Sequence, residues 1–259
     1  MRHAELFFPI LEEESKQAIL EVSGLLRIFK DLSIDDDSRL LDLSCGIGRH
    51  SKILSKKFKV VGYDPSSYYV NFAKKDAESE MTNSHKGLSF YTGEPGKPDL
   101  ELFGKEDKFR IIISMFQSIG YISRAYDLAM FKNLRKISSN NCLLVLETEN
   151  KDWRLRNFEK NKIYEYDSIR IVEKWRFDVK DDIFRNRMKI YTRGKDNRFQ
   201  DLVLDLPTYM ILYTLEELNE ITKKAGWKFV RSYHSVRSRK PATTHSQMPL
   251  SIYKKISKK

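Results

Sequence analysis

The sequence predicts an α/β fold with a doubly wound, mostly parallel sheet that is interrupted by an antiparallel β insertion. Two observations carry this prediction. Short apolar segments alternate with amphipathic segments over the first 150 residues, which is typical of a parallel sheet with crossover helices. Between residues 162 and 212, aromatic or branched residues alternate with charged ones at a period of two, which indicates antiparallel strands with one solvated face.

The apolar segments mark strands, and the amphipathic segments between them mark helices. We expect strands at 40–43, 59–64, 88–91, 111–113 and 143–147, and helices at 11–31, at 49–57, after Pro65 and at 123–138. Residues 181–182 and 194–197 are predicted hairpin turns within the insertion. The spacing of Thr214 and Glu217 favours a capped helix over 214–225, which ends at Gly226 and precedes strands at 227–234 and 249–256.

The composition excludes several classes of protein. A chain of 259 residues, 41% of them hydrophobic, can bury a sizeable core as one main domain with a modest insertion. No apolar run approaches the roughly 18–20 residues of a membrane-spanning helix, and the N-terminus does not resemble a signal peptide. The only two cysteines, Cys45 and Cys142, exclude a disulfide framework and a four-cysteine zinc site. We therefore expect a cytoplasmic protein with no membrane contact and no metal.

The formal net charge of +11 is concentrated near the C-terminus. Residues 223–259 contain eleven Lys or Arg and no Asp or Glu, so the first 222 residues carry equal numbers of each sign. One interpretation is a solvated basic tail. The other is a surface that attracts phosphate or carboxylate groups.

A glycine turn and a later carboxylate predict a ligand that contains a nucleoside. Gly46 and Gly48 lie between the first predicted strand and its helix, where a ligand can approach the backbone and the unpaired N–H groups of the helix. Asp64 ends the second predicted strand, 22 residues after Asp42. A carboxylate at that place can accept hydrogen bonds from both hydroxyls of a ribose.

Two residues distinguish between candidate nucleosides. A dinucleotide motif would have a third glycine where Ser51 stands, which disfavours a nicotinamide dehydrogenase. Asp42, inside the strand before the glycines, is unfavourable beside a pyrophosphate but suits a ligand with an ammonium group. S-adenosylmethionine has an ammonium group and a sulfonium and lacks phosphate, so we expect it as the cofactor.

Four segments of the chain resemble the class I S-adenosylmethionine-dependent methyltransferases. They are residues 41–50, 60–66, 116–121 and 213–227. The resemblance covers most of the chain apart from 151–212, where only the presence of an insertion matches. It implies a Rossmann-like, seven-stranded, mostly parallel sheet with an antiparallel last strand, formed by residues 1–150 and 213–259. It also implies that residues 151–212 form an antiparallel β lid, and enzymes of that branch act mostly on small molecules.

The resemblance also implies the cofactor-binding residues: Asp42, Ser44, Cys45, Gly46, Gly48, Tyr63, Asp64, Pro65, Glu94, Phe116 and Gln117. In this assignment Asp42, Ser44, Gly46 and Gly48 surround the methionine moiety, and Asp64 holds the ribose. Cys45 is a small buried residue beside the glycines. Tyr63 or Pro65 flanks the adenine, Glu94 lies near its amino group, and Phe116 and Gln117 line the cofactor on the substrate side. The chain departs from the family in having Phe109-Arg110 before the fourth strand, where an Asp is usual, and Glu94 for the commoner Asp.

No catalytic residue can be assigned from the sequence. Hydrolase motifs are absent, and methyl transfer from a sulfonium is an in-line displacement in which the protein mainly aligns and desolvates the reactants. A missing catalytic signature is therefore expected. His50 and Tyr121 are candidates for a catalytic role, although a histidine that opens a helix is more often a capping or packing residue. Tyr121 is also a candidate for acceptor binding.

The acceptor is predicted to be a small molecule methylated on nitrogen or oxygen. In this family the loop between the last two strands lies on the substrate side, and here it carries Arg237 and Arg239. We expect these arginines to attract an anionic acceptor. The chain is expected to act as a monomer or a homodimer.

Two other functions stay open. An RNA methyltransferase is favoured by the sequence pI of about 9.4 but disfavoured by charge divided between two edges and by the lack of an RNA-binding module. A non-catalytic nucleoside-binding or scaffold protein is disfavoured by the intact set of Asp42, Gly46, Gly48 and Asp64.

Overall fold

The computed structural model contains a seven-stranded and a four-stranded sheet, and it describes residues 3–79, 87–97, 103 and 108–256. The larger sheet has the order β10-β11-β5-β4-β1-β2-β3, and all its strands are parallel except β11, which runs antiparallel to both neighbours. This arrangement confirms the predicted Rossmann-like fold class with its antiparallel last strand and its inserted antiparallel sheet.

The strands of the larger sheet lie close to their predicted positions. They are β1 (Arg39–Leu43), β2 (Lys59–Asp64), β3 (Leu88–Thr92), β4 (Phe109–Ser114), β5 (Ser138–Glu147), β10 (Trp227–Tyr233) and β11 (Leu250–Lys255). The register places Asp42 beside Gly62 on one side and Ile113 on the other. The carboxyl ends of β1, β2 and β4 therefore share one edge of the sheet, where ligands bind in folds of this kind.

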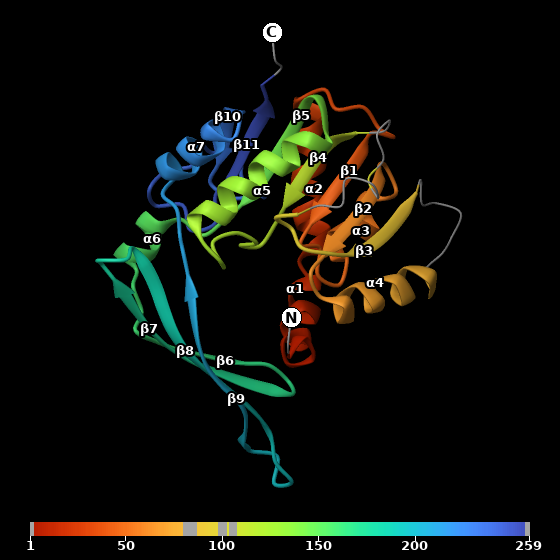
Figure 1. Cartoon of the computed structure of the whole chain (residues 1–259). Coiled ribbons are helices and arrows are strands. Elements are labelled where there is room, and N and C mark those ends of the chain that lie inside the picture. The colour runs from red at the N-terminus through yellow and green to blue at the C-terminus, as the bar shows by residue number, and fades with distance from the viewer. Residues whose placement is uncertain (1–2, 80–86, 98–102, 104–107, 257–259) are drawn as a thin grey trace.

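Helices cover both faces of this sheet (Figure 1). They are α1 (Phe8–Ser15), α2 (Ala18–Asp31), α3 (Arg49–Leu54), α4 (Ser67–Ser79), α5 (Arg124–Ile137), α6 (Lys151–Arg156) and α7 (Leu215–Lys224), with a short 3₁₀ turn η1 at Ala4–Phe7. The residues of each strand alternate between the two faces: Leu41 packs toward α5 and α7, and Leu40 packs toward α2 and α3. This alternation is the period of two that a strand buried on both faces requires.

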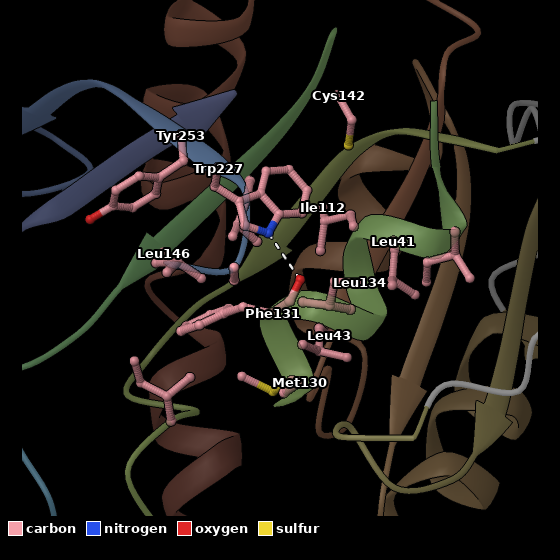
Figure 2. Close-up of a cluster of buried hydrophobic side chains, with 14 of the residues drawn as sticks. Leu41, Leu43, Ile112, Met130, Phe131, Leu134, Cys142, Leu146, Trp227 and Tyr253 are labelled. Carbon is pink, nitrogen blue, oxygen red and sulfur yellow. Dashed lines mark hydrogen bonds between the residues drawn. The ribbon is translucent and has the colours of Figure 1, made fainter. Parts of the chain in front are cut away.

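The core between the sheet and α5 is anchored by Trp227 (Figure 2). Its ring is fully buried, and its indole Nε1 donates a hydrogen bond of 2.9 Å to the carbonyl of Phe131 in α5. A buried indole needs such a partner, because an unpaired N–H in an apolar core is costly. The contact fixes α5 against the antiparallel end of the sheet.

The inserted sheet is built from four antiparallel strands, β6 (Asn161–Glu165), β7 (Ile169–Asp178), β8 (Ile183–Arg193) and β9 (Phe199–Met210). Ile169, Ile171 and Ile190 on its apolar face pack against Leu6 and Ile10 at the N-terminus. The opposite side of the same N-terminal segment includes Phe8 and Leu11. It packs against Ile47 in the turn after β1 and against Tyr69 and Phe72 of α4. The N-terminal segment thus joins the two sheets.

Three details differ from the sequence-based expectation. The helix predicted over 11–31 is two helices that break at Lys16–Gln17, because α1 packs between the inserted sheet and the Ile47–α4 region while α2 packs on the large sheet. β5 begins five residues earlier than predicted, at Ser138, and residues 151–156 form α6, capped by the Asn150 side chain. Among the described residues, no helix combines the length and the hydropathy needed to cross a bilayer.

Candidate functional site

The turn between β1 and α3 adopts left-handed backbone conformations at Ser44, Gly46 and Gly48, with φ of 59°, 55° and 76°. A Cβ on Gly46 would meet only the Leu11 side chain at 3.6 Å, so the backbone is open to a ligand at this point. A Cβ on Gly48 would lie 2.7 Å from the ring of Phe90. The lack of a side chain at Gly48 therefore lets the turn pack closely on Phe90 of β3. The lack of a side chain at Gly46 leaves the backbone of the turn accessible to a ligand.

Asp64 links this turn to the end of β2. Its Oδ2 accepts a hydrogen bond from the backbone N–H of Gly46 at 2.9 Å, and its Oδ1 accepts one from Ser66 at 2.8 Å. Burial raises the pKa of Asp64, and the two N–H donors partly offset that rise. A carboxylate has about four lone-pair sites, so two acceptor positions remain for the hydroxyls of a ligand.

Asp42 is almost fully buried beneath the same turn. Its Oδ2 accepts a hydrogen bond from the hydroxyl of Ser51 at 2.6 Å. Burial raises the pKa of Asp42, while His50, Ser51 and Arg49 act in the opposite direction. Ser51 stands where a dinucleotide motif would have its third glycine, and here its hydroxyl holds a carboxylate that such a motif lacks.

The segment that follows β4 forms a second wall of the site. Phe116 and Gln117 both have positive φ, 57° and 51°, a strained conformation for residues with side chains. The Gln117 side chain fixes the loop by donating to the carbonyl of Ile119 at 2.9 Å and accepting from the N–H of Glu149. The Phe116 ring remains 42% exposed and lies 5.4 Å from the Arg49 guanidinium.

A network of buried charged side chains joins α2 to the start of α3, directly after the turn. Glu21 of α2 accepts hydrogen bonds from Arg49 at 2.7 Å and from the His50 ring at 2.8 Å through the same Oε2. Hydrogen bonding from His50 and the charges of Arg49 and His50 outweigh burial and lower the pKa of Glu21. His50 is 4% exposed, and the contact with Glu21 fixes its ring at the edge of the cleft.

These parts enclose a cleft of about 340 Å³ at the carboxyl edge of the sheet. It is lined by the predicted residues Asp42, Ser44, Cys45, Gly46, His50, Asp64, Pro65, Glu94, Phe116, Gln117 and Tyr121. Its size is typical of a small-molecule site. Burial, together with Asp42 and Asp64, raises the pKa of Cys45 well above its usual range, so this thiol is not activated as a nucleophile.

Four predicted site residues lie outside the lining of the cleft. Gly48 packs on Phe90, and the Tyr63 ring packs edge-on against Phe103 in the core, with ring centroids 5.4 Å apart. Arg237 donates to Gln17 at 2.8 Å and lies 3.9 Å from Glu21, whereas Arg239 pairs with Asp31 at the other end of α2.

A family model described as a methyltransferase domain matches residues 14–232. The chain belongs to this methyltransferase family. The match supports the predicted class I S-adenosylmethionine-dependent methyltransferase. A search of curated proteins finds no match.

Solved structures of methyltransferases share the fold. An S-adenosylmethionine-dependent methyltransferase from Clostridium acetobutylicum has a TM-score of 0.75 and 15% identity, with 92% of each chain covered. The CcbJ methyltransferase from Streptomyces caelestis has a TM-score of 0.72 and 14% identity, covering 92% of this chain and 90% of that one. The sugar N-methyltransferase KedS8 from Streptoalloteichus sp has a TM-score of 0.69 and 14% identity, covering 96% and 93%.

Several residues that line or adjoin the cleft lie outside the motifs found in the sequence. Leu11 comes from α1, and Tyr69 from α4, where its hydroxyl donates to the carbonyl of Ala4 at 2.9 Å. Asp127 of α5 accepts from Tyr213 at 2.6 Å and from the N–H of Gly120 at 3.4 Å. They could not have been found from local spacing, because only the packing of distant elements brings them to the cleft.

Tyr121 lines the cleft, and Tyr164, Glu149 and Glu173 lie outside its lining. Tyr121 has 52% of its surface exposed, yet it lies in a concavity surrounded by protein, and this burial raises the pKa of its hydroxyl to about 12. Nearby Glu149 and Glu173 contribute to that rise. Tyr164 of β6 has its pKa raised to about 12 by burial and by the same two acids. Both acids are already engaged: Glu149 pairs with Arg154 at 3.2 Å, and Glu173 accepts hydrogen bonds from Trp175 at 2.8 Å and from Asn186 at 3.0 Å.

Proposed function

We propose that this methyltransferase transfers a methyl group from S-adenosylmethionine to a small molecule, on a nitrogen atom. The observation that carries the proposal is the pair of buried carboxylates, Asp42 and Asp64, at the ends of adjacent strands on either side of the open turn at Gly46. The pair offers hydrogen-bond acceptors to an ammonium group and to a ribose within one cleft.

The residues of the cleft fit this cofactor better than a phosphorylated nucleotide. Asp42, Asp64 and Glu94 make the lining acidic. Arg49 is the single Lys or Arg among the described lining residues, and its guanidinium is already held by Glu21 and by the carbonyl of Glu14. The net negative charge of a phosphorylated nucleotide would be unfavourable here, whereas the sulfonium and ammonium of S-adenosylmethionine outweigh its one carboxylate and give it a net positive charge.

The protein contributes alignment and exclusion of water. The cofactor supplies an activated methyl group, and a well-oriented acceptor can gain roughly 7–11 kcal/mol of barrier lowering from placement alone. We assign Asp64 to hold the ribose, Asp42 and the Gly46 turn to hold the amino-acid end, and Phe116 to separate cofactor from acceptor. The inserted sheet and α1 act in this proposal as a lid that keeps water out.

The electrostatic surroundings of Tyr121 favour an amine as the methyl acceptor. The negative charges of Glu149 and Glu173 act on the Tyr121 hydroxyl and favour a basic group beside it, while Glu149 itself pairs with Arg154 and Glu173 accepts from Trp175 and Asn186. The Tyr121 hydroxyl, with its raised pKa, stays protonated at neutral pH and can donate a hydrogen bond, but it cannot act as a base there. The fold shared with the sugar N-methyltransferase KedS8 supports an amino sugar as the acceptor class. An anionic acceptor would instead depend on Arg237 and Arg239, which lie along α2.

Two measurements test the proposal. Calorimetric titration is expected to show binding of S-adenosylmethionine and S-adenosylhomocysteine and no comparable binding of ATP or NAD. A methyl-transfer assay with an amino sugar is expected to give product, and the matching sugar with a hydroxyl in place of the amine is expected to give none. Tight binding of ATP without binding of either sulfur compound would overturn the cofactor assignment. Binding without turnover on any amine would favour the scaffold alternative, and turnover on RNA would favour the RNA methyltransferase.

A further inference from the structure

A second hollow, of about 620 Å³, lies at the amino-terminal ends of the parallel strands, the edge opposite the cleft. It is lined by Lys108, Lys132, Arg135, Lys136, Asn140, Ala225 and Lys255. In Figure 1 this is the end of the large sheet where β11 ends, away from the inserted sheet. We call this set of residues the basic pocket.

The positive charge of the basic pocket comes from three separate elements. Arg135 and Lys136 lie in the last turn of α5, where the partial negative charge of a helix C-terminus favours cations. That effect does not explain Lys108, which precedes β4, or Lys255, which ends β11. Within the described chain, none of the five cations forms an ion pair with a carboxylate, although many other Lys and Arg residues do.

The segments next to the basic pocket in the sequence do not reverse its charge. Residues 104–107 and 257–259 lie outside the described residues, and together they carry three lysines and two acids. The formal charge of this region therefore stays strongly positive.

Two of the cations are held in place by backbone groups. Arg135 donates to the carbonyl of Ile256 at 2.6 Å, and its Nε is buried without a partner in the described structure. Its guanidinium lies so close to Gly226 that a Cβ there would be 2.8 Å from Nε. Lys255 donates to the carbonyl of Ser138 at 2.5 Å, and burial, Lys108 and Arg135 lower its pKa.

Like charges brought together in this way repel one another, and an anion between them relieves the repulsion. We infer that the basic pocket binds a compact, multiply charged phosphate anion, such as an oligophosphate group. A single hollow lined by five cations fits a compact ligand better than an extended polynucleotide, which needs a longer track of phosphate contacts. This inference is independent of the acceptor and the cofactor of the proposed function.

The test uses inorganic tripolyphosphate as the probe and the full chain as the protein. Binding is measured by calorimetry at about 0.1 M salt, where attraction beyond a Debye length of about 10 Å is largely screened. We expect Lys132→Glu/Lys136→Glu to weaken tripolyphosphate binding by about tenfold or more, since two favourable charge contacts become repulsive. The matched control is Lys74→Glu/Lys75→Glu on α4, an identical charge change at two exposed lysines, and it is expected to bind within about twofold of wild type.

Other results would overturn the inference. If the wild type does not bind tripolyphosphate, the basic pocket is not an anion site. An equal loss in the control variant would show only diffuse attraction to a basic protein. Tighter binding of a single-stranded RNA oligomer, with an affinity that falls steeply with salt, would assign the surface to a nucleic acid instead. Lys132→Ala/Lys136→Ala tests the same contacts without charge reversal, and urea midpoints establish that each variant is folded. Unchanged S-adenosylmethionine binding in the variants separates this site from the cleft.

Discussion

The backbone N–H of Phe116 donates a hydrogen bond of 3.3 Å to the carboxylate of Glu147, which is buried at the end of β5. The Glu147 carbonyl accepts a second bond, of 3.1 Å, from the N–H of Gln117. One residue therefore holds both left-handed residues of the loop that lines the cleft. Strained conformations of this kind persist only when the surroundings fix them, and Glu147 provides much of that support.

The charge on Glu147 should make folding stability depend on pH. Burial and the nearby Glu21 raise the pKa of Glu147 from 4.5 to about 7, while Arg49, Arg237 and the Phe116 N–H act in the opposite direction. Between pH 4.5 and 7 the folded state keeps this proton and the unfolded state loses it. Stability contributed by the protonated group is therefore lost as the pH rises through this window.

Glu147→Gln should remove that loss, because the amide stays neutral and its oxygen can still accept from Phe116. We compare the free energies of unfolding of the variant and the wild type by urea unfolding. The advantage of the variant is expected to grow by on the order of 2 kcal/mol from pH 5 to pH 8. Glu78→Gln, at an exposed position of α4, is the control and should show no such gain. A constant difference between Glu147→Gln and wild type across this range would contradict the assignment.

Asp64 is expected to dominate the affinity for the cofactor. Asp64→Ala removes the two free acceptor positions and the bonds to Gly46 and Ser66, and hydrogen bonds to a charged group contribute roughly 1.5–3 kcal/mol each. We predict that S-adenosylmethionine binds at least about tenfold more weakly in calorimetry. Asp201→Ala on β9 removes an exposed acid and should leave the affinity unchanged. Equal affinities of wild type and Asp64→Ala would refute the ribose assignment.

Tyr121 is expected to orient the acceptor without taking its proton. Tyr121→Phe should lower kcat/KM by about tenfold or less through a higher KM, which matches the loss of one hydrogen bond of about 1 kcal/mol. The dissociation constant of S-adenosylmethionine should not change. A loss of roughly 10²–10⁴-fold in kcat would instead indicate general-base catalysis by this residue. Tyr68→Phe, an exposed tyrosine of α4, controls for the loss of a hydroxyl.

The sequence was sufficient for the parts of the fold and site that are set by local pattern. The alternation of strands and helices predicted the parallel sheet. The short spacing from Asp42 through Gly46 to Asp64 predicted residues that do meet in one cleft, because consecutive parallel strands end at the same edge. Local pattern also found the hairpin turns and the capping box at Thr214 and Glu217.

What the sequence did not reveal depends on long-range packing. A stripe of apolar residues cannot show that α1 and α2 face different sheets, so the break at Lys16–Gln17 was missed. The period of two places Tyr63 on one face of β2 but does not say that this face is the core. Arg239 was expected at the acceptor, and its contact with Asp31 joins residues 208 positions apart. The roles of Arg237 and Arg239 in acceptor binding stay a prediction.

Gly120 is expected to be the glycine near the cleft that is least tolerant of substitution. Its φ is +85°, and a Cβ would lie 2.0 Å from the carbonyl oxygen of Ile211, whose own N–H bonds to the Gly120 carbonyl at 2.8 Å. Gly120→Ala must therefore shift the chain where β9 returns to the large sheet, and we expect a loss of about 2–4 kcal/mol in unfolding free energy. Gly46→Ala has a similar positive φ but open space around its Cβ, so the backbone conformation alone should cost about 1–2 kcal/mol. Urea unfolding of both variants separates steric contact from backbone strain, and equal losses would show that contact with Ile211 adds nothing.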